Sequence, residues 1–197
     1  MRFAPATHAP LVDLIWPAGA RNFARMAALA VVGSLLLWAS AKAQVPMWPV
    51  PMTMQTFAVV AIGFAYGAKL GMATVVLYLA QGAMGLPVFA GTPEKGLGLP
   101  YMLGTTGGYL LGFVLAAGLA GWLAERGWGR DIVRLSLAML AGHALIFVPG
   151  VAWLATFVGA EKAIAFGLTP FLAGAVVKAA LGVAVLMAAD RTLARRG

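Results

Sequence analysis

The sequence predicts an all-α membrane protein, a bundle of six transmembrane helices with both termini in the cytoplasm. Hydrophobic residues make up 62% of the 197 positions and charged residues only 10%, and the mean hydropathy is +0.91. So much apolar surface needs lipid to cover it. Because one crossing consumes about 20 apolar residues, a chain of this length has room for about six.

The first half of the chain contains three predicted spans. The first covers residues from about Phe23 to Ala41 and is followed by a proline-rich stretch, residues 45–51, which cannot form a regular helix. The second covers about Gln55 to Tyr66 and the third about Gly71 to Met84. Both are short for a crossing, so helical overhang into the flanking loops is expected to complete them.

A long connection separates these spans from three more. It covers Gly85 to Thr106 and contains three prolines and five glycines. A connection of this length in a small bundle is usually functional. The remaining predicted spans cover about Gly107 to Leu123, Leu135 to Val158 and Pro170 to Ala189.

The distribution of lysine and arginine predicts the orientation. With the N-terminus inside, ten of the 14 basic residues are cytoplasmic, three are outside, and Lys178 lies within a span, which satisfies the positive-inside rule. The outer three are Lys42, Lys95 and Lys162. The expected organisation is a cytoplasmic extension (1–22), a transmembrane binding domain (23–190) and a basic cytoplasmic tail (191–197).

Several function classes are excluded by missing residue patterns. The chain has no cysteine and two histidines without companion ligands, so no metal site is predicted. It has no phosphate-binding GxxxxGK loop and no paired acids within a span, so we predict no catalytic residues and no enzyme activity. The basic residues form no stripe interleaved with aromatics, which argues against nucleic acid as a partner.

Two polar residues lie within the predicted spans. Lys178 is near the middle of the last span, where a lysine costs about 2.5 to 3.5 kcal/mol unless something compensates it. A buried pocket with an anionic ligand provides that compensation, and the alternative is that the side chain snorkels to an interface. His143 in the fifth span is interpreted as a helix-packing residue, with a proton relay as the alternative.

Small residues recur every four positions. One set is Gly63, Gly67 and Gly71, and another is Gly104, Gly108 and Gly112. Such spacing lets helices approach closely, so both sets are expected to support packing within the bundle. A similar small face in the first span is formed by Ala24 and Ala28, where a partner helix can dock.

Three motifs in order resemble the BioY family, the biotin-binding S components of energy-coupling factor (ECF) transporters. The first is PVPMTMQT at 49–56, the second YLAQGAMGLPVFAG at 78–91, and the third GTTGGYL at 104–110. A further stretch, residues 170–178, resembles a family segment that ends in a lysine, which matches Lys178. The family's aspartate in that segment is replaced here by Ala175.

The resemblance implies a non-enzyme in the inner (cytoplasmic) membrane that captures biotin from the outer side with high affinity. Its partners are a transmembrane coupling subunit and ATP-binding cassette ATPases, which drive import, and no cofactor is implied. Ala24 and Ala28 are the expected partner interface, although Ala39 and Ala43 fit the same pattern. The predicted substrate-binding residues are Lys178 for the carboxylate and Gln55 and Thr106 for the ureido ring. Phe89, Tyr101 and Tyr109 are predicted to contact the ring, with interfacial anchoring as the alternative for each.

Three other interpretations stay open at the level of sequence, and one of them is a structural bundle that binds no ligand. Because Ala175 departs from the family pattern, an S component for another small anionic vitamin is the first alternative. A membrane-embedded lipid-modifying enzyme is an alternative of a different class, although the chain has no paired acids or activated nucleophile to support it.

Overall fold

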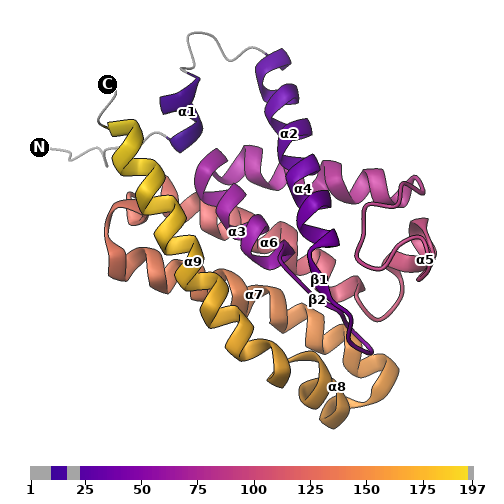
Figure 1. Ribbon diagram of the computed structural model, residues 1–197. Coiled ribbons are helices and arrows are strands. Elements are labelled where there is room, and N and C mark those ends of the chain that lie inside the picture. Colours follow the sequence, from indigo (N-terminus) through magenta and orange to yellow (C-terminus); the bar gives the residue numbers. More distant parts are fainter. Residues whose placement is uncertain (1–9, 17–22, 195–197) are drawn as a thin grey trace, which may run out of the picture.

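The structure is a computed structural model that describes residues 10–16 and 23–194, and over these residues the chain is mostly helical (Figure 1). The longer helices are α2 (Phe23–Lys42), α3 (Gln55–Tyr66), α4 (Ala68–Ala83), α6 (Gly107–Ala124), α7 (Ile132–Val158) and α9 (Thr169–Ala194). The short elements are α1 (Leu11–Ile15), β1 (Gln44–Val45), β2 (Met52–Thr53), α5 (Gly98–Met102), η1 (Trp128–Arg130) and α8 (Ala160–Gly167).

Helices occupy all the segments that the sequence predicts as spans. The expectation that helical overhang lengthens the second span is wrong. Helix α3 has the predicted bounds and only 12 residues, which corresponds to a length of about 18 Å. The reason is that α3 begins inside the protein, where Thr53 and Gln55 are both buried. Irregular backbone at membrane depth is tolerated where protein covers it.

Four helical stretches in the described part of the chain are long and apolar enough to cross a membrane. They are Phe23–Lys42, Gly107–Ala124, Ile132–Val158 and Ala160–Thr192, the last of which joins α8 to α9. Large apolar side chains such as Val32, Leu36, Val148 and Val177 are more than half exposed on these helices. Exposed aliphatic faces of this kind are stable against lipid, not against water.

Helix α6 lies at the centre of the bundle and packs on α7, α3 and α4. Glycines permit this close packing. A Cβ atom on Gly112 would lie 2.8 Å from the backbone Cα and O of Ile146 on α7, and one on Gly63 would lie 2.8 Å from the Cβ of Ala120 on α6. The predicted role of the glycine sets in packing within the bundle is therefore confirmed for these two positions.

A single residue, Gly67, joins α3 to α4. Its φ of 79° lies in the left-handed region that favours glycine, so the chain reverses direction without a longer loop. The carboxylate of Glu125, at the end of α6, accepts a hydrogen bond from the backbone N–H of Ala68 at 2.9 Å. This contact caps the first turn of α4.

The connections gather at two ends of the bundle. At one end, here called the loop end, are the connection 43–54 with the β1–β2 pair, the connection 84–106 with α5, and the turn around α8 (Figure 1). At the other, the terminal end, lie α1 and the last turns of α9. In the antiparallel β1–β2 pair, Gln44 is opposite Thr53, so this pair directs the chain into α3.

Helix α1 is attached to the terminal end by Arg25 of α2. The Arg25 guanidinium lies 2.7 Å from a carboxylate oxygen of Asp13 and donates to the carbonyl of Val12 at 3.3 Å. The rest of the predicted extension (1–9 and 17–22) and Arg195 and Arg196 of the predicted tail lie outside the described residues. Within the described part, α9 continues to Ala194, past the predicted end of the last span.

Candidate binding site

A pocket at the loop end is enclosed by α3, α6, α7, α9 and the connections 43–54 and 84–106. Five of the predicted substrate-binding residues line it together: Gln55, Tyr101, Thr106, Tyr109 and Lys178. Its volume is about 50 Å³, well below the roughly 300 Å³ at which small-molecule pockets begin. The structure thus has the pocket in a contracted form, and a vitamin-sized ligand requires its walls to move apart.

Helix α9 presents three residues to the pocket on one face. Phe171, Ala175 and Lys178 are spaced four and three positions apart and are all buried, as expected for neighbours on one side of a helix. The opposite face, with Val176 and Val177, is exposed. This arrangement turns the lysine into the protein, although the helix itself borders the lipid.

The ammonium of Lys178 is held at the beginning of α3. Its Nζ donates to the carbonyl of Thr53 at 2.6 Å and to the hydroxyl of Thr56 at 3.4 Å, and only 8% of the residue is exposed. A lysine ammonium has three N–H donors, so these two contacts leave one for a ligand. The charge lies in the pocket, not at an interface, which disagrees with the snorkelling alternative.

Gln55 is the second polar group of the pocket and begins α3. Its Nε2 donates to the Tyr78 hydroxyl at 2.7 Å, and that hydroxyl donates to the carbonyl of Val88 at 2.8 Å. Both side chains are at least 96% buried. This chain of hydrogen bonds fixes the side-chain amide and links α3, α4 and the connection 84–106.

Two tyrosines form the aromatic part of the lining. Tyr109 of α6 donates its hydroxyl to the carbonyl of Gly167 at 2.8 Å, and Tyr101 of α5 donates to the carbonyl of Ala90 at 2.8 Å. Burial raises the pKa of Tyr101 above its ordinary value, so this phenol stays neutral and remains a donor. Both rings are buried in the protein, which disagrees with interfacial anchoring.

Phe89 does not line the pocket. It stacks on Tyr101 with ring centroids 4.8 Å apart and an interplanar angle of 14°, and it is 1% exposed. It therefore lies behind the wall that Tyr101 forms. In this geometry Phe89 supports the ring of Tyr101 and does not itself contact the pocket.

Several lining residues were missed by the sequence analysis. Phe113, Phe147 and Phe171 belong to the apolar wall, but the sequence of an apolar helix does not show whether an aromatic residue faces a ligand or the core. Thr53 and Thr56 were inside a motif noted in the sequence, and their short hydroxyl side chains beside Gln55 were the available signal.

His143 lies in α7 and is 2% exposed. Its Nδ1 is 2.8 Å from the carbonyl of Met139, one turn earlier in the same helix, so this nitrogen carries the proton. The contact is one that a packing residue makes, whereas the other ring nitrogen, Nε2, is buried without a hydrogen-bond partner in the described part of the chain.

Ala24 and Ala28 lie far from the pocket, at the terminal end of α2, and both are exposed. They share one side of the helix because they are four residues apart. The structure thus places a small-residue face on the surface of α2 at the terminal end, whereas the pocket is lined by residues of the loop-end connections and of α3, α6, α7 and α9.

Comparisons with known proteins agree on one family. The family model described as "BioY family" matches residues 11–195. A probable biotin transporter BioY of Pyrococcus horikoshii is 41% identical over 145 residues, which is 74% of this chain and 83% of the relative. The biotin transporter BioY of Thermotoga maritima is 41% identical over 163 residues, 82% of this chain and 88% of the relative.

A solved structure has the same fold. The crystal structure of the S-component for biotin from an ECF-type ABC transporter superposes with a TM-score of 0.73 and 21% sequence identity. The match covers 87% of this chain and 95% of that chain. At this identity, the likeness concerns the fold alone.

Proposed function

Because the chain belongs to the BioY family, we propose that it is the biotin-binding S component of a vitamin uptake transporter. It is a membrane transport protein and not an enzyme. The observation that carries the proposal is the pocket in which the Lys178 ammonium and the Gln55 amide face a wall of aromatic rings. Biotin has matching parts, a carboxylate, a ureido ring and an apolar chain.

In this proposal each polar group of biotin has a partner. The carboxylate accepts the third N–H of Lys178, a charge-assisted hydrogen bond in a largely dry site. The ureido N–H groups donate to the Oε1 of Gln55 and to backbone carbonyls, while Thr106 donates to the ureido oxygen. Tyr101, backed by Phe89, and Tyr109 contact the ring and the valeryl chain. These assignments replace the family's aspartate, whose position is Ala175 here.

The proposed location is the inner (cytoplasmic) membrane. The proposed topology has both termini in the cytoplasm and six crossings, formed by α2, α3, α4, α6, α7 and α9. The basic residues support it, because Arg126, Arg130 and Arg134 lie together at the terminal end and Lys42 lies at the loop end. The pocket then opens to the outside. The binding domain extends over residues 23–190, with 1–22 and 191–197 on the cytoplasmic side.

Import itself requires partners in this proposal. Since the sequence has no phosphate-binding loop, a coupling transmembrane subunit and ATP-binding cassette ATPases supply the energy. Ala24 and Ala28 form the contact with the coupling subunit, because small exposed residues on a helix allow a partner helix to approach closely. The second candidate, an S component for another small anionic vitamin, is favoured only by the alanine at position 175.

Calorimetry on the detergent-solubilised protein tests the function. We expect tight binding of biotin, and binding at least about tenfold weaker for biotin amide, because the amide lacks the charge that pairs with Lys178. Desthiobiotin, which keeps the carboxylate, serves as the matched comparator and should stay closer to biotin. A folded, ligand-free protein that ignores biotin but binds another carboxylated vitamin would establish the second candidate instead.

Replacing Gln55 with leucine tests the proposed ureido contact. The leucine side chain fills similar space but accepts no hydrogen bond, so we expect biotin binding to weaken about tenfold, the effect of about 1.4 kcal/mol. Gln55→Asn is the matched variant, since it keeps an amide that accepts a hydrogen bond and adds no charge, and it should bind biotin more tightly than Gln55→Leu does. Calorimetry with biotin measures both. Unchanged affinity in Gln55→Leu would remove Gln55 from the site and leave the function in place.

A further inference from the structure

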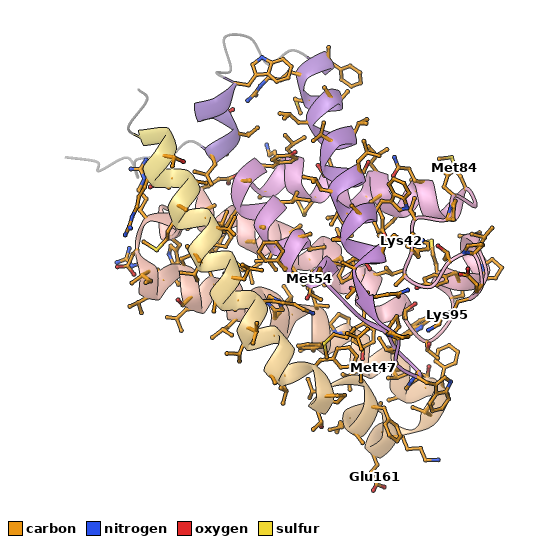
Figure 2. The ribbon with its side chains drawn as sticks, in the orientation of Figure 1. Lys42, Met47, Met54, Met84, Lys95 and Glu161 are labelled. Atoms are coloured by element: carbon orange, nitrogen blue, oxygen red, sulfur yellow. The ribbon has the colours of Figure 1, made fainter. Side chains whose placement is uncertain are left out.

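The ammonium of Lys42 is directed entirely at one turn of the connection 84–106. Lys42 ends α2 at the loop end (Figure 2), and its Nζ donates to the carbonyl of Phe89 at 3.2 Å, the carbonyl of Thr92 at 3.1 Å and the hydroxyl of Thr92 at 3.2 Å. These three acceptors match the three N–H donors of an ammonium. The Thr92 hydroxyl also donates to Phe89 O at 2.7 Å, so the turn is closed on itself.

This turn supports one wall of the binding pocket. Ala90, between the two residues that Lys42 contacts, lines the pocket, and its carbonyl accepts the hydroxyl of Tyr101. The ring of Phe89 stacks on Tyr101 on one side and meets Tyr78 edge to face, at 5.5 Å between centroids, on the other. The position of Tyr101 therefore depends on the turn that Lys42 holds.

Tyr101 also borders a second cavity at the loop end. This cavity, here called the vestibule, has a volume of about 350 Å³, and its lining includes Trp48, Lys95 and Pro100. It shares Pro51, Tyr101 and Thr106 with the binding pocket. These three residues form the boundary between a roomy outer cavity and a contracted inner one.

We propose that Lys42 is a positioning residue that holds Tyr101 closed across the boundary between the vestibule and the pocket. Biotin passes from the vestibule to the pocket when the turn at residues 89–92 moves and carries Tyr101 with it. The Lys42 contacts oppose that movement, so they slow both access and release. The inference rests on the proposed function for the identity of the ligand, whereas the contacts themselves are independent of it.

The test uses the full-length protein in detergent with tritiated biotin. Lys42→Ala should raise both the association and the dissociation rate constants about tenfold, with a smaller change in Kd, because charge-assisted hydrogen bonds to the closed form are lost. Lys42→Arg, which keeps several donors, should stay within about threefold of the wild type in both rate constants. Lys162→Ala removes an exposed charge of α8 at the same end and should change neither.

Hydrogen exchange on the ligand-free protein tests the same contacts without biotin. In Lys42→Ala the backbone amides of residues 88–101 should exchange faster, while those of α6 should not change. A wild-type protein that binds biotin, with Lys42→Ala keeping the wild-type rate constants, would overturn this inference and leave the proposed function intact. A faster dissociation with an unchanged association rate also contradicts it, because a merely structural role has that effect.

If the wild type does not bind biotin, the proposed function fails, and the exchange experiment still decides the role of Lys42. Unchanged exchange of residues 88–101 in Lys42→Ala would then overturn the inference. Faster exchange confined to these residues would support it.

Discussion

Replacing Lys178 with alanine is expected to weaken biotin binding by at least about 100-fold, which corresponds to about 2.8 kcal/mol. The ammonium is the one charged group among the residues that line the described pocket. Removing it leaves the ligand carboxylate without a counter-charge in a desolvated site, and such losses cost about 2 to 5 kcal/mol. The effect should exceed that of any other substitution in the lining.

The fold should survive this substitution. Alanine leaves the carbonyl of Thr53 without the donor it has at 2.6 Å, but it also removes a buried charge whose desolvation is unfavourable. These two effects oppose each other. Lys178→Met is the better matched variant, because it keeps an unbranched apolar side chain of similar length and removes the ammonium, with both its charge and its hydrogen bonds to Thr53 and Thr56, and it should weaken binding as much as alanine does.

The measurement is calorimetry with biotin and biotin amide on the wild type, Lys178→Met and Lys69→Ala. Lys69 is an exposed lysine of α4 at the terminal end. The Lys69→Ala variant should therefore bind biotin as tightly as the wild type does. In Lys178→Met, biotin and biotin amide should bind with similar affinity, since the ammonium that favours the carboxylate over the neutral amide is gone. A preference for biotin that persists in Lys178→Met would place the carboxylate elsewhere.

The sequence predicts the parts of this molecule that local patterns determine. The start of α3 at Gln55 follows from the prolines before it, and the close packing of Gly63 and Gly112 follows from their spacing. The depth of Lys178 in an apolar run was enough to single it out, because a lysine there has few physical explanations.

Other features depend on contacts between distant segments and could not be predicted. The helix α5 (Gly98–Met102) forms within a stretch whose glycines and Pro100 disfavour helix, so tertiary contacts decide it. Lys42 looked like an ordinary basic residue at a membrane face, and its acceptors at Phe89 and Thr92 are far along the chain. The support of Tyr101 by Phe89 likewise exists only once α5 has folded onto the connection.

Close packing of α6 on α7 leads to the second large effect, the loss of folded protein in Gly112→Leu. A Cβ atom at position 112 would lie 2.8 Å from both the Cα and the carbonyl oxygen of Ile146. These are backbone atoms, so no side-chain rotation can make room. The two helices must separate, and in a bilayer the van der Waals contacts that hold helices together are then lost.

Even alanine at position 112 should destabilise the protein, by about 1 to 3 kcal/mol, the usual effect of overpacking. Gly118→Ala is the matched control on the same helix, because a Cβ there would meet Met72 only through its flexible side chain. The measurement is the fraction of monodisperse protein after solubilisation, together with the thermal unfolding midpoint. We expect Gly112→Leu to give almost no folded protein, Gly112→Ala a lowered midpoint and Gly118→Ala a midpoint close to wild type.

A second substitution identifies the cause of the loss. If the clash is with the backbone of α7, truncating the neighbouring side chain in Gly112→Ala with Ile146→Ala cannot restore the midpoint, because the backbone atoms of residue 146 remain in place. Recovery in that double variant would show that side-chain crowding, not the distance between the helix backbones, limits position 112. The same separation of α6 from α7 would move Phe113 and Tyr109 away from Phe147 across the pocket. Any folded Gly112→Ala should therefore also bind biotin more weakly than Gly118→Ala.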